Sequence, residues 1–139
     1  MPSPVDTSST RPVVLIVEDH VDTRQMYEEF LSNRFEIVTA ADGREALDVM
    51  AAGPLPDLVI TDLGLPRLGG LELITEMRQN DEMRHVPVIC LSGYGGEAHN
   101  KRAQAAGCNR ILQKPCMPDD LGDVAEELLR SSRNQDSPD

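Results

Sequence analysis

Short apolar runs recur along the chain, and most of them are rich in β-branched residues. They lie at 13–17, 37–38, 58–60, 88–91 and 111–112. The runs are mostly continuous and do not alternate with polar residues, which is typical of strands covered on both faces of a sheet.

Between the runs, apolar residues recur at helical spacing. The clearest stripe is Leu121, Val124, Ala125, Leu128 and Leu129, at i, i+3, i+4, i+7 and i+8. Earlier stripes are Val21, Met26, Tyr27, Phe30 and Leu31, then Ala46, Leu47 and Met50, then Leu71, Ile74 and Met77. The segment 97–106 has mostly alanine as its apolar content, so we expect its helix to be held weakly. Alternating strands and helices predict an α/β domain with a parallel sheet and helices on both faces.

The chain of 139 residues is one domain's worth. We predict a folded domain over 12–131, with polar, Pro/Ser-containing tails at 1–11 and 132–139 that are disordered. There is no apolar run near the roughly 20 residues of a membrane helix, and the first residues lack a signal-peptide core. The cysteines, Cys90, Cys108 and Cys116, have no CxxC spacing, which favours reduced thiols over a disulfide or a zinc site. We therefore expect a cytoplasmic protein that does not bind membranes.

Charge and composition argue against nucleic-acid partners. The formal net charge is −11, tryptophan is absent and there are only four tyrosines and phenylalanines in total. Binding to nucleic acid needs a basic surface, and single-strand binding adds stacking aromatics. Phosphate-binding loops of the GxxxxGK[ST] and GxGxxG types are also missing, which disfavours nucleotide binding.

Polar side chains follow the predicted strands. Glu18 and Asp19 come after the first, Asp62 after the third, Ser92 after the fourth and Lys114 after the fifth. Because ligands bind outside the carboxyl ends of parallel strands, we expect these groups to gather at one edge.

Three clustered carboxylates repel each other, at about 4 kcal/mol per pair at 4 Å and an effective dielectric of about 20. A hard divalent cation such as Mg²⁺ offsets this repulsion, and Lys114 adds a further positive charge. A carboxylate can attack phosphorus to give an aspartyl phosphate, and phosphoryl transfer needs mainly positioning and charge neutralisation. The cluster therefore predicts a phosphoryl-accepting site.

The set Glu18-Asp19, Asp62 with Pro66 and Gly69-Gly70, Ser92-Gly93 and Lys114-Pro115 resembles the receiver domain of two-component response regulators. The resemblance covers about residues 12–131. It implies the flavodoxin-like, doubly wound fold, with five parallel strands in the order 2-1-3-4-5.

The resemblance also implies a role for each matched residue. Asp62 is expected to be the phosphoacceptor. Mg²⁺ is expected to be bound by Asp19, by Asp62, by Glu18 directly or through water, and by the backbone carbonyl of Gly64. Ser92 is expected to be the switch hydroxyl and Lys114 to pair with a phosphoryl oxygen, with a cis Lys114–Pro115 bond.

The implied partners are proteins. A sensor histidine kinase or a histidine phosphotransfer protein donates the phosphoryl group, and a downstream effector protein or output domain reads the switch. A phosphorylation-dependent dimer is a further expectation. The protein is expected to catalyse only its own phosphorylation and dephosphorylation, and the weakly held segment 97–106 to be the part that moves.

Some positions depart from the common pattern of the family. The acidic pair is Glu-Asp rather than Asp-Asp, Ile111 replaces an aromatic residue, Cys116 replaces a phenylalanine and Met117 stands at the expected N-cap of the last helix. Ile111 makes the usual readout of the switch an open question. Gly64 and Tyr94 offer no carboxylate or amide to orient an attacking water, so we expect a long-lived phosphorylated form.

Two other functions remain as alternatives. One is a receiver-like interaction module that needs no phosphate, which the absence of an aromatic residue at Ile111 supports. The other is a metal-dependent phosphatase with an aspartyl nucleophile. Such enzymes commonly carry a second acid two residues after the nucleophile, where this chain has Gly64.

Overall fold

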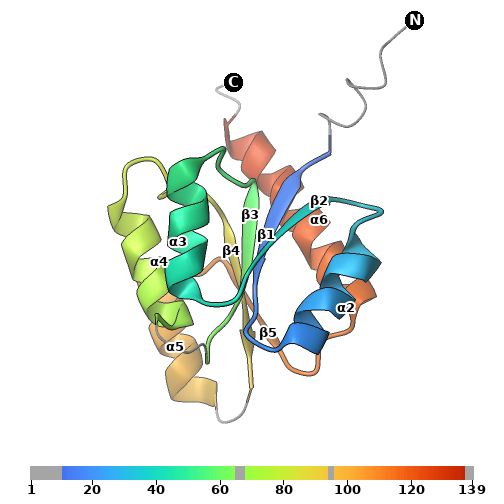
Figure 1. Ribbon diagram of the computed structural model, residues 1–139. Coiled ribbons are helices and arrows are strands. Elements are labelled where there is room, and N and C mark those ends of the chain that lie inside the picture. Colours follow the sequence, from blue (N-terminus) through green and yellow to red (C-terminus); the bar gives the residue numbers. More distant parts are fainter. Residues whose placement is uncertain (1–10, 65–67, 94–95, 137–139) are drawn as a thin grey trace, which may run out of the picture.

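The structure is a computed structural model that describes residues 11–64, 68–93 and 96–136. Five strands alternate with five helices along the chain (Figure 1). The strands are β1 (Val13–Val17), β2 (Glu36–Ala40), β3 (Leu58–Asp62), β4 (Val88–Ser92) and β5 (Arg110–Gln113). The helices are α2 (Val21–Leu31), α3 (Gly43–Ala52), α4 (Gly70–Gln79), α5 (Gly96–Ala106) and α6 (Pro118–Asp136).

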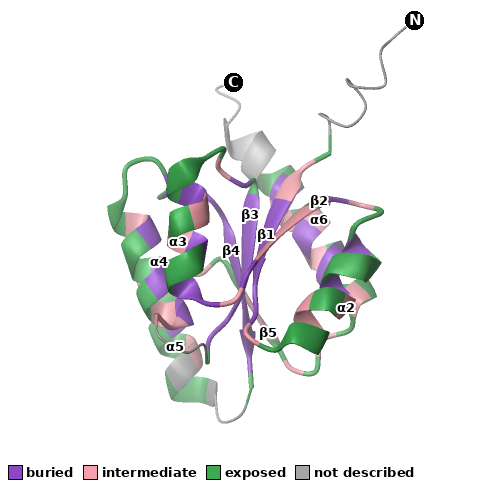
Figure 2. Cartoon of the chain, in the orientation of Figure 1, coloured by how far each residue is buried: buried purple, intermediate pink, exposed green. Residues whose placement is uncertain are grey.

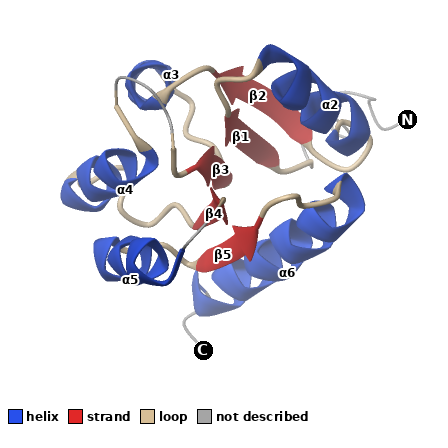
Figure 3. Ribbon diagram, turned by 90° about the horizontal axis from the view of Figure 1, so that it is seen from below, coloured by secondary structure: helices blue, strands red, loops and turns tan. Residues whose placement is uncertain are grey.

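All strand pairs are parallel, and the strand order is β2-β1-β3-β4-β5. The fold class and strand order predicted above are therefore confirmed. Seen along the strands, α3, α4 and α5 cover one face of the sheet and α2 and α6 cover the other (Figure 3). Among the described residues, no helix has the length and apolar character needed to cross a membrane.

The double cover explains the continuous apolar runs. β3 and β4 are buried along their whole length, and β1 from Val14 onward (Figure 2). Successive side chains of a strand point to opposite faces, so each strand feeds two cores. In β1, Leu15 and Val17 belong to the core under α3–α5, whereas Val14 and Ile16 belong to the core under α2 and α6.

Two expectations about side-chain burial need correction in α2. Tyr27 and Leu31 are buried, but Val21 is 52% exposed and Phe30 is 59% exposed. At about 100° per residue, positions nine apart lie on opposite sides of a helix, so Val21 and Phe30 cannot share one face.

The predicted end of the folded domain also differs from the structure. α6 continues to Asp136, past position 131, so residues 132–136 are helical and not a disordered tail. Residues 1–10 and 137–139, where most of the predicted disorder falls, lie outside the described residues.

α5 contributes little to the core. Of its described side chains, only Ala103 is fully buried, and Ala106 packs partly against the same cluster. By contrast, α6 buries Leu121, Ala125 and Leu129. Burial stabilises by about 25 cal/mol per Å² of apolar surface, so α5 is held with much less free energy than α6.

Candidate functional site

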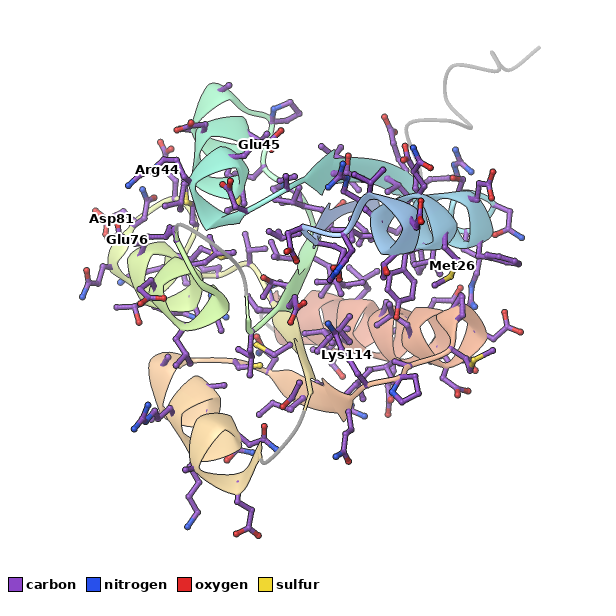
Figure 4. All side chains as sticks on the ribbon, turned by 60° about the horizontal axis from the view of Figure 1, so that its bottom comes forward. Met26, Arg44, Glu45, Glu76, Asp81 and Lys114 are labelled. Carbon is purple, nitrogen blue, oxygen red and sulfur yellow. The ribbon has the colours of Figure 1, made fainter. Side chains whose placement is uncertain are left out.

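The polar residues picked out above meet at the carboxyl edge of the sheet. Asp62 and Ser92 are the last residues of β3 and β4, and Glu18 and Lys114 directly follow β1 and β5. The strand register aligns Val17 with Thr61, Asp62 with Leu91, and Ser92 with Gln113. Figure 4 brings this edge forward, with Lys114 lying near the middle of the view.

Asp62 and Lys114 are in direct contact. Lys114 Nζ lies 2.6 Å from Asp62 Oδ2, and the backbone N–H of Gly64 donates to Asp62 Oδ1 at 3.0 Å. The Asp62 side chain is 10% exposed and that of Lys114 33%. Both carboxylate oxygens of Asp62 are therefore held by donors, and one edge of the pair remains open to solvent.

Glu18 is a buried acid with an unsatisfied oxygen. Its side chain is 2% exposed, and Oε2 accepts the backbone N–H of His20 at 3.1 Å. Oε1 is buried and has no hydrogen-bond partner among the described residues. Burial raises the pKa of Glu18, an effect that the His20 hydrogen bond and Lys114 oppose and that Asp62 and Asp19 reinforce. A buried acceptor without a partner costs about 1–3 kcal/mol, more if it is charged.

These residues fit a divalent cation. Ligand atoms of Glu18, Asp19 and His20 lie within 4.8 Å of one another, and Glu18 supplies the unpartnered oxygen that a cation would satisfy. Asp19 is one-third exposed, which leaves room for the water ligands that Mg²⁺ retains. Of this group, the two carboxylates suit Mg²⁺, whereas His20 offers a nitrogen that hard cations do not prefer.

Ser92 is tied to the same edge through its backbone. Ser92 is 3% exposed, and its backbone carbonyl oxygen accepts a hydrogen bond from the backbone N–H of Lys114 at 2.8 Å. The Lys114–Pro115 bond is cis, as the resemblance implies. Tyr94, which we expect to affect the lifetime of the phosphorylated form, lies outside the described residues.

Gly70 explains part of the Gly69-Gly70 motif. A Cβ at Gly70 would lie 2.6 Å from the carbonyl oxygen of Asp62 and 2.8 Å from Leu63 Cα, so a side chain there would displace the backbone. The first turn of α4 thus packs directly on the end of β3, which fixes the backbone that carries Asp62. Pro66 lies outside the described residues.

Sequence reasoning missed a groove beside the site. A groove of about 820 Å³ runs from Gly93 and Lys114 along 115–119 to Thr23, Met26, Tyr27 and Phe30 of α2. Two of its lining residues are joined, because the Tyr27 hydroxyl donates to the carbonyl oxygen of Cys116 at 2.8 Å. Burial raises the pKa of Tyr27 to about 12. The exposed side chains of Phe30 and Met117 (64%) flank the groove. A helical projection of 21–31 shows an apolar residue on the solvent side and is the signal that could have found this surface.

The chain is similar to proteins of two-component signalling. The profile of the response regulator receiver domain matches residues 14–126. The polar-differentiation response regulator DivK of Brucella anthropi is 32% identical over 103 residues, which are 73% of this chain and 83% of that protein. The sensor histidine kinase TmoS of Ectopseudomonas mendocina is 35% identical over 121 residues, which are 87% of this chain and only 12% of that protein.

Solved structures are similar in the same way. The chemotaxis response regulator CheY4 of Vibrio cholerae has a TM-score of 0.77 and 30% identity, covering 86% of this chain and 99% of that one. A response regulator receiver domain from Clostridium thermocellum has a TM-score of 0.82 and 25% identity, covering 89% and 98%.

Proposed function

Because the chain belongs to the response regulator receiver domain family, a family of two-component signalling, we propose that it is a switch that accepts a phosphoryl group on Asp62. The observation that carries this proposal is the contact of Asp62 with Lys114 at 2.6 Å, together with a buried Glu18 oxygen that has no hydrogen-bond partner in the described part of the chain. A carboxylate nucleophile at the edge of the sheet, a cation for the transferred charge and an acidic group that can hold a metal are the parts that phosphoryl transfer needs.

The proposed reaction is a nucleophilic displacement at phosphorus. An oxygen of the Asp62 carboxylate forms the new O–P bond, and the P–N bond to a donor imidazole breaks, with the electron pair leaving on nitrogen. Lys114 moves its ammonium from the carboxylate to a phosphoryl oxygen, and the Ser92 hydroxyl donates to another. Glu18, Asp19, Asp62 and the Gly64 carbonyl would hold Mg²⁺, and a bound Mg²⁺ would supply positive charge next to the transferring group.

The donor we propose is a protein that carries phosphohistidine, either a sensor kinase or a phosphotransfer protein. To bring its phosphorus in line with Asp62, such a donor must cover the surface next to Lys114. That surface is the groove between α2 and 115–119, flanked by the exposed Phe30 and Met117. Exposed apolar side chains beside a polar rim are what a protein-binding surface requires.

The output we propose is a shift of α5, read by a downstream effector or an output domain, or by a second copy of the chain. α5 follows Ser92 along the chain and buries only Ala103 fully. A population change from about 1:99 to 99:1 takes about 5.5 kcal/mol, and a weakly packed helix lowers the opposing cost. Ile111 is partly buried and packs on the same core cluster as α5. We propose that it occupies the position from which an aromatic ring, in the common family pattern, would respond to the switch.

The test is intact-protein mass spectrometry after incubation with a small phosphodonor and with a phosphohistidine protein, with and without Mg²⁺. Asp62→Asn removes the nucleophile, and the exposed Asp48→Asn is the matched control. We expect a metal-dependent gain of one phosphoryl group in the wild type and in Asp48→Asn and none in Asp62→Asn. Labelling of Asp62→Asn, or none in the wild type with either donor, would overturn the proposal.

The phosphate-independent interaction module makes the opposite prediction in cells. If Asp62→Asn retains full signalling while the fold is intact, the module is the better description. Continuous release of phosphate from small phosphate esters would instead indicate an enzyme.

A further inference from the structure

Two cysteines far apart in the sequence meet in the fold, away from the carboxylate cluster. Cys90 lies in the middle of β4, and Cys108 lies in the turn between α5 and β5. Their sulfur atoms are 3.0 Å apart and hydrogen-bonded, and all three cysteines of the chain are free thiols. The third, Cys116, packs against the core on the other face of the sheet.

From this contact we propose that Cys90 and Cys108 form a redox-sensitive dithiol, which a hydroperoxide converts into an intramolecular disulfide. The two sulfurs already lie in contact at 3.0 Å, about 1 Å beyond the length of a disulfide bond. In a reducing compartment such bonds are usually transient and serve as redox sensors.

The two sulfurs differ in exposure and in pKa, as is needed if one thiol reacts first with the oxidant and the other then attacks it. Cys90 is 0% exposed, whereas Cys108 is partly exposed and is the sulfur that an oxidant reaches. The hydrogen bond with Cys90 lowers the pKa of Cys108, and the nearby charge of Arg78 lowers it further, while the same hydrogen bond and burial raise the pKa of Cys90. A partly exposed thiol in an electropositive setting is the type that reacts as a thiolate.

Arg78 supplies this setting from α4. Its Nε and Nη2 donate to the carbonyl oxygen of Gly107 at 3.1 and 2.9 Å, directly before Cys108. The Cys108 sulfur also lies 2.9 Å from the carbonyl oxygen of Arg110, which accepts the single thiol proton when that proton does not point to Cys90.

The proposed reaction takes up one hydroperoxide. The Cys108 thiolate attacks the peroxide, an S–O bond forms, the O–O bond breaks and hydroxide (or alkoxide) leaves, which gives a sulfenic acid. The sulfur of Cys90 then attacks the sulfur of Cys108, the S–O bond breaks and the hydroxyl leaves as water with the Cys90 proton. For hydrogen peroxide, two thiols and one peroxide give one disulfide and two water molecules.

The disulfide would join β4 to the turn at the carboxyl end of α5. Under the proposed function, it would restrain the helix that we expect to move, and that consequence rests on the proposed function. The oxidation chemistry does not, because it uses none of the residues at the carboxylate edge.

The experiment treats the purified chain with hydrogen peroxide, blocks the remaining thiols with an alkylating reagent and maps the peptides without reduction. We expect loss of two of the three thiols, a Cys90–Cys108 cross-linked peptide, one alkylated Cys116, and full recovery with dithiothreitol. Cys116→Ser is the matched control and is expected to give the same cross-link. Asp62→Asn is also expected to give it, so failure of the phosphorylation test leaves this one independent.

Cys108→Ser, at a partly exposed position, is expected to abolish the cross-link and leave Cys90 unoxidised. Cys90→Ala is expected to leave Cys108 as a sulfenic or sulfinic acid. A cross-link through Cys116, disulfide-linked dimers, or oxidation of Cys108 beyond sulfenic acid with Cys90 still alkylatable in the wild type would each overturn the proposal.

Discussion

The carboxyl and amino edges of the sheet differ in how well their buried or half-buried charged groups are hydrogen-bonded. At the carboxyl edge, Glu18 keeps a buried oxygen without a partner among the described residues. At the amino edge, the half-buried guanidinium of Arg78 makes five hydrogen bonds, to the carbonyl oxygens of Arg84, Val86 and Gly107 (two) and to Oδ1 of Asn109. A guanidinium has five N–H donors, so this charge is fully satisfied.

The difference separates a structural charge from a functional one. The hydrogen bonds of Arg78 join α4 to the segments that lead into β4 and β5, and nothing is left over for a ligand. The carboxyl edge instead carries clustered carboxylates and, among the described residues, an unpaired acceptor, and a bound cation would relieve both. Removing the charge of Arg78 is therefore expected to destabilise the fold. Removing the charge of Glu18 is expected to stabilise the metal-free fold and to weaken Mg²⁺ binding.

The largest effect is expected for Arg78→Met. The variant keeps much of the packing but leaves several carbonyl oxygens without donors, and we expect a loss of about 3 kcal/mol in the free energy of unfolding, measured by urea denaturation. Arg78→Lys is the control, and it is expected to recover only part of the loss because an ammonium cannot reproduce the planar fork. A loss below about 0.5 kcal/mol, typical of a surface substitution, would mean that this cluster is not structural.

The next effect is expected for Gly107→Ala. Gly107 has φ +115°, and an added Cβ would lie 2.8 Å from both Cγ and Nε of Arg78, whose position is fixed by its hydrogen bonds. We expect a loss of about 1–3 kcal/mol.

Gly53→Ala separates the effect of backbone strain from the effect of the contact with Arg78 in the Gly107→Ala variant. Gly53 also has a positive φ, +69°, but nothing lies within 4 Å of an added Cβ. It is therefore expected to report backbone strain alone. Equal losses in the two variants would show that contact with Arg78 contributes nothing.

Asn109→Ala tests the same cluster from the other side. Oδ1 of Asn109 accepts from the backbone N–H of Val88 at 2.8 Å as well as from Arg78, so the variant leaves two donors unpaired. We expect a loss of about 1–2 kcal/mol in thermal or urea unfolding. Asn109→Asp keeps an acceptor and is expected to stay near the wild type; a loss equal to that of Asn109→Ala would argue against this hydrogen bonding.

The smallest effect, and the only gain, is expected for Glu18→Gln in excess chelator at neutral pH. Burial raises the pKa of Glu18 above its ordinary value of 4.5, so the folded chain binds this proton more tightly than the unfolded chain does. The ionised side chain thus destabilises the metal-free fold, and this loss grows as pH rises from about 4.5 through the raised pKa. We expect Glu18→Gln to stabilise by about 1 kcal/mol at pH 7, with the gain vanishing as pH falls toward 4.5.

The same variant is expected to bind Mg²⁺ more weakly, so the order of stability reverses at high Mg²⁺. Glu29→Gln removes an exposed glutamate of α2, the helix that follows Glu18 along the chain, and serves as the control. If Glu18→Gln lowers the free energy of unfolding at every pH without metal, the ionised carboxylate stabilises the fold, and the prediction is wrong.

The sequence alone determined the order of the elements, the parallel sheet and the edge at which Glu18, Asp62, Ser92 and Lys114 meet. Apolar periodicity reports which faces of an element are buried, and a parallel sheet brings the carboxyl ends of its strands to one edge whatever the loops do. The family resemblance supplied the strand order and residue roles. The stripe assigned to α2 was wrong at Val21 and Phe30, which are nine positions apart and, at about 100° per residue, cannot lie on one face of a helix.

Only the tertiary structure decided which distant groups touch. Arg78 is one polar residue of a helical segment until the turns before β4 and β5 place their carbonyl oxygens around it, and Cys90 and Cys108 look like unrelated thiols until β4 and the α5–β5 turn pack together. Within the described ranges, the packing around Glu18 leaves its Oε1 without a hydrogen-bond partner. Such contacts depend on loop paths and on how layers pack, and neither has a period along the chain.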